Sequence, residues 1–139
     1  MAYRLLSHHS VRFNPHYIGG GPVAFAKAVR KTLTYDVKTP QEFDEKVLRS
    51  ELPVVVDFHA SWCGPCKTLT PRLASVMETY EGKVNLAKVD VDDLQDLALD
   101  FGIMSVPTVF GLKNGDIVDK FIGLKETNEL HSFVQQLVD

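Results

Sequence analysis

The stretch VVVDFHASWCGPCK, residues 54–67, joins the two patterns that decide the fold. Residues 53–59 are almost all β-branched or aromatic, which predicts a strand covered on both faces of a sheet. After the cysteines, apolar residues recur at helical spacing. This stripe consists of Leu69, Leu73, Val76, Met77 and Tyr80. A buried strand that leads into a helix indicates an α/β domain, with Cys63 and Cys66 at the N-terminus of the helix.

Further strands and helices are expected on the N-terminal side and directly after this unit. Residues 33–37 and 84–91 have the composition of strands. The segment TPQE, residues 39–42, has the pattern of a capped helix start with proline at the first helical position. The order strand, helix, strand implies a parallel pair with a right-handed crossover between residues 53–59 and 84–91.

A β-hairpin and two more helices are expected in the C-terminal third. Asn114-Gly115 lies between two apolar runs, which is the strongest short signal for a hairpin. Residues 94–101 form a helical pattern that Gly102 ends, and residues 130–138 form another. We therefore expect an α/β fold over residues 33–139: a central mixed β-sheet with helices on both faces and the hairpin at one edge.

The N-terminal segment differs in charge from the rest of the chain. Residues 1–35 hold five basic side chains and no acidic one, whereas the remainder holds ten basic and eighteen acidic residues. A basic, serine-bearing and acid-free leader is typical of a mitochondrial transit peptide, which we predict for residues 1–32. A disordered basic tail that the mature protein keeps is the alternative.

Two other classes of partner are disfavoured by the composition. The acidic domain behind the leader argues against binding of nucleic acid, which needs cationic side chains at the phosphates. No apolar run approaches the roughly 20 residues that cross a bilayer, so no membrane span is expected.

Cys63 and Cys66 are the only cysteines of the sequence. A structural disulfide is disfavoured, because a loop of two intervening residues yields little stabilisation. A structural zinc site is also disfavoured, because it needs four protein ligands and only His59 lies near the pair. The remaining interpretation is a redox-active pair with no bound metal.

A reactive pair suits the start of a helix. Unpaired N–H groups and the helix dipole favour a negative charge there, so the pKa of the Cys63 thiol should be lowered. Cys63 is expected to be the more exposed sulfur and to attack a substrate disulfide, and Cys66 is expected to resolve the mixed disulfide. Pro65 stiffens the connecting loop, and Gly64 permits close approach of a partner.

Asp57 and Trp62 are expected to support this chemistry. Asp57 interrupts an apolar strand, so burial should raise the pKa of its carboxyl group, which could then take the proton of Cys66 through a water. A structural ion pair between Asp57 and Lys88 on the next strand is the alternative. Trp62 lies at a loop tip and is expected to be partly exposed, as an apolar contact for partners. His59 is expected to be structural.

Four segments occur together at set distances: VVVDFHASWCGPCK (54–67), AKVDVDD (87–93), SVPTV (105–109) and KNGDIVDKFIG (113–123). Together they resemble the thioredoxin family over residues 33–139, and the resemblance implies the thioredoxin fold. No further cysteine lies near the C-terminus, and a basic leader is present. Both features favour the mitochondrial type of that family.

The resemblance also implies roles for individual residues. Asp57 corresponds to the proton acceptor of the family, and Lys88 to the lysine beside it. Pro107 is implied to be a cis proline packed against the cysteines, which exposes the backbone of Val106 to an extended client segment. Gly123 is expected to leave room for the client, and a plain glycine at a strand end is the alternative.

The implied function is a protein-disulfide reductase that maintains mitochondrial redox homeostasis. By resemblance, its electrons come from NADPH through a flavoprotein, thioredoxin reductase, and its clients include peroxiredoxins of the mitochondrial matrix. No bound cofactor is expected beyond the Cys63–Cys66 disulfide, and the protein is expected to be a monomer.

A disulfide oxidase or isomerase is an alternative function, but such proteins usually carry another dipeptide between the cysteines. A binding module without redox turnover is a second alternative, against which the two intact cysteines argue.

Overall fold

The computed structural model describes residues 31–139, so the expected leader over residues 1–32 lies outside the described residues except for its last two positions. The elements are β1 (Thr34–Asp36), α1 (Pro40–Phe43), η2 (Asp44–Leu48), β2 (Val54–His59), α2 (Gly64–Glu78), β3 (Asn85–Asp90), α3 (Gln95–Asp100), β4 (Thr108–Lys113), β5 (Asp116–Ile122) and α4 (Thr127–Val138). No helix among residues 31–139 has the length and apolar character that a membrane crossing needs.

The five strands form one mixed sheet in the order β1-β3-β2-β4-β5. β3 runs parallel to both β1 and β2, whereas β4 runs antiparallel to β2 and β5. α2 makes the connection between the parallel strands β2 and β3. The predicted parallel half and antiparallel edge are confirmed, and β2 lies at the centre of the sheet.

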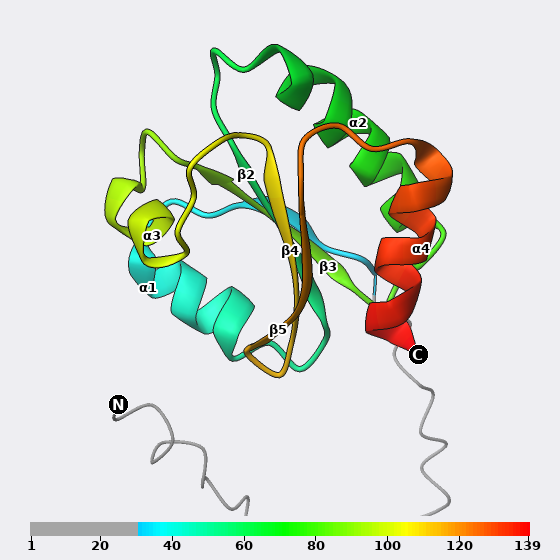
Figure 1. Ribbon diagram of the computed structural model, residues 1–139. Coiled ribbons are helices and arrows are strands. Elements are labelled where there is room, and N and C mark those ends of the chain that lie inside the picture. Colours follow the sequence, from blue (N-terminus) through cyan, green and yellow to red (C-terminus); the bar gives the residue numbers. More distant parts are fainter. Residues whose placement is uncertain (1–30) are drawn as a thin grey trace, which may run out of the picture.

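Alternation along β2 divides the core into two layers, because successive side chains of a strand point to opposite faces. Val55 belongs to the core between the sheet and the helices α2 and α4. Val56 and Phe58 belong to the core on the other face, which α1 and α3 cover (Figure 1). Asp57 alternates with Val56 and Phe58, so its carboxyl group points toward α2.

The two cores differ in composition. The face under α1 and α3 is rich in aromatic rings, which meet edge-on or tilted with centroids 5.3 to 5.6 Å apart. These rings are Phe43, Phe58, Phe101 and Phe110. The face under α2 and α4 is mainly aliphatic, with fully buried Leu69, Leu73, Leu130 and Leu137, and its aromatic members are Tyr80 and Phe133. Both layers fix the position of β2, whose C-terminal end carries the cysteine loop.

The turns follow the expected local chemistry. Asn114 and Gly115 both have positive φ, 53° and 78°, which is the backbone of the tight hairpin predicted between β4 and β5.

The first helix departs from expectation: after Phe43 it widens into the π-helical segment η2. The N–H of Arg49 donates to the carbonyl of Asp44, five residues back, at 3.0 Å, and this wider bond closes the last turn before the helix ends at Leu48.

Candidate active site

Cys63 and Cys66 lie where the central strand β2 passes into α2, and the two are joined by a disulfide. Cys63 is the N-cap of α2 in an extended conformation, and its Sγ accepts a hydrogen bond from the backbone N–H of Cys66 at 3.2 Å. Pro65 lies in the first turn, where a missing N–H costs nothing because that group would have no helical partner. The sulfur of Cys63 therefore lies against the positive end of the helix.

The expectation that Cys63 is the more exposed sulfur is wrong for this disulfide state. Cys63 is 3% exposed and Cys66 is 4% exposed. Ala60, Val91 and Val106 pack around the pair and shelter both sulfurs. The helix alone would leave its N-terminal residue open, but loops that are distant in sequence cover it.

The loop before β4 forms one wall of the site. The Val106–Pro107 peptide bond is cis, as the resemblance implied. The Sγ of Cys63 lies 3.6 Å from the carbonyl oxygen of Val106. Gly123, at the end of β5, donates its N–H to the carbonyl of Pro107 at 2.9 Å. Gly123 has a φ of 89°, and an added Cβ would meet nothing within 4 Å. The end of β2 and the start of β4 therefore meet at the disulfide, and the end of β5 is hydrogen-bonded to the segment that leads into β4.

Trp62 flanks the disulfide on the side of α3. Its side chain is 69% exposed, and its indole N–H donates to Oδ2 of Asp92 at 2.9 Å. This bond anchors a large apolar surface at the rim of the site. The expected partial exposure is confirmed, whereas the role of Asp92 was not predicted from the sequence.

An apolar groove of about 330 Å³ runs from Trp62 to Val106. Leu99, Ile103 and Met104 also line it, and Met104 is 97% exposed. Sequence reasoning missed these three residues as parts of the site. The available signal was Ile103-Met104, an apolar pair that follows the helix-ending Gly102 and belongs to no helical or strand pattern.

Asp57 is fully buried beneath α2. Burial raises the pKa of its carboxyl group, and this effect exceeds the opposing effects of a hydrogen bond from Thr70 and of the charges of His59 and Lys88. The Thr70 hydroxyl donates to Oδ2 of Asp57 at 2.7 Å. Oδ1 is the one buried side-chain oxygen or nitrogen of residues 31–139 that has no hydrogen-bond partner. The site thus holds a carboxyl group with a raised pKa, and one of its oxygens has no hydrogen-bond partner.

Lys88 is the neighbour of Asp57 on β3 in the parallel register. Its ammonium nitrogen lies 3.5 Å from Oδ1 of Asp36 on the edge strand β1. The ion pair formed by Lys88 is thus with Asp36, and this weakens the alternative in which Asp57 serves only as the structural partner of Lys88.

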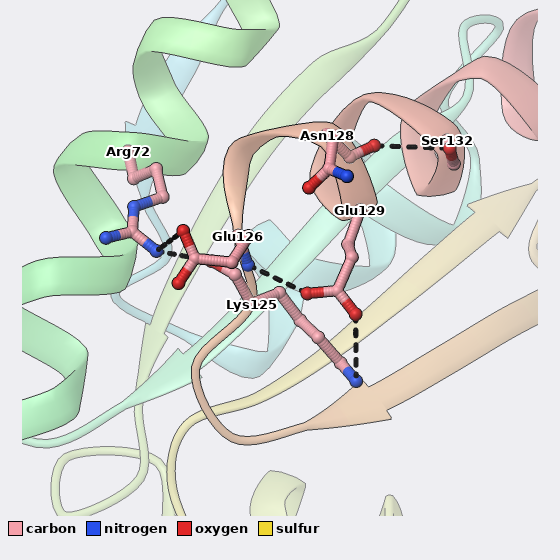
Figure 2. A network of polar contacts seen from close by, with 6 residues as sticks. All are labelled: Arg72, Lys125, Glu126, Asn128, Glu129 and Ser132. Atoms are coloured by element: carbon pink, nitrogen blue, oxygen red, sulfur yellow. Dashed lines mark hydrogen bonds and ion pairs between the residues drawn. The ribbon is translucent and has the colours of Figure 1, made fainter.

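A polar network fastens α2 to the loop between β5 and α4 (Figure 2). The guanidinium of Arg72 donates to the carbonyl of Lys125 at 2.6 Å and lies 3.7 Å from the carboxylate of Glu126. Glu126 and Glu129 form a capping box at the start of α4. Because Gly123 begins this same loop, the network connects one wall of the site to the helix that carries the cysteines.

The comparisons with known proteins match this geometry. The sequence model of the thioredoxin family matches residues 34–136, which is most of the chain. The chain belongs to the thioredoxin family. The structure of a mutant thioredoxin from Halobacterium salinarum is 30% identical with a TM-score of 0.72, and the match covers 79% of this chain and 95% of that one. A thioredoxin structure from Malassezia sympodialis is 32% identical with a TM-score of 0.70, over 79% and 94% of the two chains.

Relatives from mammals are similar over still more of the chain. The mitochondrial thioredoxin of Bos taurus is 45% identical over 131 residues, which are 91% of this chain and 78% of the relative. That of Rattus norvegicus is 44% identical over 139 residues, which are 96% and 84% of the two chains. These relatives support the mitochondrial location that the leader predicted.

This thioredoxin is a thiol–disulfide oxidoreductase, and Cys63–Cys66 is its redox-active disulfide. The predictions of a thioredoxin fold and of a dithiol reductase of disulfides are both confirmed. Among residues 31–139, no group of three or more histidine, cysteine or acidic side chains is arranged to hold a metal ion. The roles of the individual residues around the disulfide follow as a proposal.

Proposed function

We propose that Cys63 attacks the disulfide of a client protein and that Cys66 resolves the resulting mixed disulfide. The observation that carries this assignment is the hydrogen bond from the Cys66 N–H to Sγ of Cys63, at the N-terminus of α2. A thiolate at that position gains from the bond and from the helix dipole. Cys66 lies one turn further along, within reach of the same sulfur.

Asp57 accepts the proton that Cys66 releases when it attacks. Its burial, its raised pKa and its partnerless Oδ1 support this role, because a proton acceptor needs a pKa near the working pH and a free oxygen. Lys88 supports the site by its charge, which lowers the pKa of Asp57 without neutralising it in an ion pair.

A client segment binds in extended form along Val106, beside the cis Pro107. Among residues 31–139, no acceptor takes the backbone N–H of Val106, which is therefore available to an added strand. Gly64, Pro65 and Gly123 keep the rim free of bulky side chains, and Trp62 offers its exposed indole as an apolar contact.

The cellular setting extends this chemistry. The oxidised pair is reduced by thioredoxin reductase, a flavoprotein that uses NADPH, and the reduced pair serves peroxiredoxins and other disulfide-bearing clients. The location is the mitochondrial matrix, with residues 1–32 as a transit peptide and residues 33–139 as the mature thioredoxin domain. The mature protein acts as a monomer, and it binds neither nucleic acid nor membrane. The names of the mammalian relatives and the basic, acid-free leader support this setting.

Reduction of insulin, followed by turbidity, tests the assignment of the nucleophile. With dithiothreitol as the electron source, Cys63→Ser should abolish the activity, because the attacking sulfur is gone. Gln135→Ala, an exposed change in the C-terminal half of α4, should behave like the wild type. Residual turnover in Cys63→Ser would refute the assignment. Absence of turnover in the wild type would instead favour a binding module.

A second assay separates a reductase from an oxidase or isomerase. Wild-type protein is equilibrated with glutathione buffers of varied redox ratio, and the fraction of the disulfide form is measured. A reductase holds its dithiol only in strongly reducing buffers, whereas an oxidase keeps a stable dithiol in mildly oxidising ones. The second result would overturn the proposed direction of electron flow.

A further inference from the structure

One polar contact links the buried carboxyl group to the helix that carries the cysteines. The hydroxyl of Thr70 donates to Oδ2 of Asp57 at 2.7 Å, across the space between α2 and the sheet. Thr70 lies four residues after Cys66, so both side chains lie on the same face of α2. The carboxyl group bound by Thr70 is thereby placed beneath the turn that begins with Cys66.

We propose that Thr70 is a positioning residue of the resolving step, which holds Oδ2 of Asp57 and leaves Oδ1 to accept the proton of Cys66. The inference rests on the proposed function of Asp57. The two carboxyl oxygens differ within residues 31–139, because Oδ2 has the Thr70 hydroxyl as its donor and Oδ1 has no partner. A fixed carboxyl plane with one free oxygen suits directional proton transfer.

The chemical step balances as follows. The S–H bond of Cys66 breaks, and its proton passes to Oδ1 of Asp57 directly or through one water. The Cys66 thiolate attacks Sγ of Cys63, so the Cys63–Cys66 bond forms as the bond from Cys63 to the client sulfur breaks. The client leaves as a thiolate. Its disulfide has then gained two electrons, and the dithiol of this protein has lost them.

Thr70 also shifts the pH range in which Asp57 can act. A hydroxyl that donates to a carboxylate stabilises the charged form, so the Thr70 bond lowers a pKa that burial raises. The other charged groups that act on Asp57 are His59, two residues along β2, and Lys88 on β3; both favour the carboxylate. The neighbour of Asp57 on β4 is Val109, which is apolar. On α2, Cys66 lies one turn before Thr70 and is bonded in the disulfide.

The test compares Thr70→Val, which removes the hydroxyl at nearly constant volume, with Thr70→Ser, which keeps it. Thr68→Val is the matched control, because Thr68 is an exposed threonine on the same helix. The pKa of Asp57 is measured by carbon NMR on the disulfide form, in which no thiol titrates. Loss of a hydrogen bond to a charged group should raise the pKa by about one pH unit. Thr70→Ser and Thr68→Val should leave the pKa of Asp57 unchanged.

A second experiment measures the rate at which Cys66 resolves the mixed disulfide, by stopped-flow absorbance. Reduced protein is mixed with an equimolar aromatic disulfide, dithionitrobenzoate, and the second release of coloured thiolate reports the attack by Cys66. The pH profile of this phase in Thr70→Val should move upward by about one pH unit, with about tenfold slower resolution on its acid side. Thr70→Ser should restore the wild-type profile.

The variant Asp57→Asn separates the proposed positioning role of Thr70 from the proposed role of Asp57 as proton acceptor. Slow resolution in Asp57→Asn together with an unmoved profile in Thr70→Val would overturn the role of Thr70 and leave that of Asp57 standing. Wild-type resolution in Asp57→Asn would overturn both. If Thr70→Val does not fold, Thr70→Ala removes the same hydroxyl without placing a methyl group beside the Asp57 carboxyl group, and it is judged by the same outcomes.

Discussion

The backbone N–H of Cys66 donates to Sγ of Cys63 at 3.2 Å, so the first cysteine caps the helix that contains the second. In most helices a serine, threonine or aspartate oxygen takes this bond. Here the acceptor is the sulfur that we propose as the nucleophile, and the N–H group that would stabilise its negative charge belongs to Cys66, the proposed resolving residue. In the proposed mechanism, capping and catalysis therefore use the same three-residue spacing.

Cys66→Ser should trap clients as covalent adducts of Cys63. The serine hydroxyl cannot displace the client sulfur, so the mixed disulfide persists until an external thiol is added. Non-reducing electrophoresis of the variant mixed with an oxidised client should show an adduct that dithiothreitol cleaves by reducing the mixed disulfide. The double variant Cys63→Ser/Cys66→Ser should form none, and an equal yield from both proteins would contradict the assignment.

Asp57→Asn should stabilise the fold at neutral pH. Burial raises the folded-state pKa of Asp57 above its ordinary value of about 3.9. Between these two values the folded state binds more protons than the unfolded state, so the stability of the wild type falls as pH rises through that window. The neutral asparagine avoids this loss. Urea unfolding should give a higher midpoint for the variant above the window and converging midpoints at acid pH. Equal midpoints at every pH would show that folding does not raise the pKa of the Asp57 carboxyl group.

Trp62→Ala should raise KM for protein clients by roughly three- to tenfold, because an exposed apolar contact of about 1 kcal/mol is lost. The free energy of unfolding should change by no more than about 0.5 kcal/mol, since the side chain is 69% exposed. Ile117→Ala is the control: Ile117 is 54% exposed and lies in the hairpin at the opposite end of the sheet (Figure 1). An equal rise of KM in both variants would remove Trp62 from the client surface.

Arg72→Met should loosen the loop that starts at Gly123. The guanidinium bond to the carbonyl of Lys125 is short and charge-assisted, and its loss should cost about 1 to 2 kcal/mol. Hydrogen exchange of residues 123–126 should accelerate. Arg49→Met removes an ion pair with Asp44 in which Arg49 is 51% exposed, and should cost about 0.5 kcal/mol or less. Equal costs for the two variants would show that the Arg72 network does not fasten the loop.

Local sequence patterns predicted the features that depend on neighbours in the chain. Asn114-Gly115 specified the hairpin because its backbone requires positive φ at both residues. The run from Val54 to His59 specified a central strand because it is apolar almost throughout. The reactivity of Cys63 and Cys66 followed from their place at a helix start, which a strand–helix boundary makes visible.

Features that depend on the assembled fold could not be predicted in this way. The bond between Thr70 and Asp57 joins residues on different elements, and a threonine in a helix gives no sign of it. The groove wall at Leu99 and Met104 exists only once α3 is placed beside Trp62. The burial of Cys63 likewise requires Val106, which lies 43 residues further along the chain.

Alkylation of the reduced protein by iodoacetamide, followed as a function of pH, measures the ionisation of Cys63 most directly. Cys66→Ser, which leaves Cys63 as the single thiol, is measured alongside so that the signal is assigned. Charge stabilisation at the N-terminus of α2 predicts a pKa of the Cys63 thiol well below the value of about 8.5 for free cysteine. A midpoint at or above that value would contradict the account.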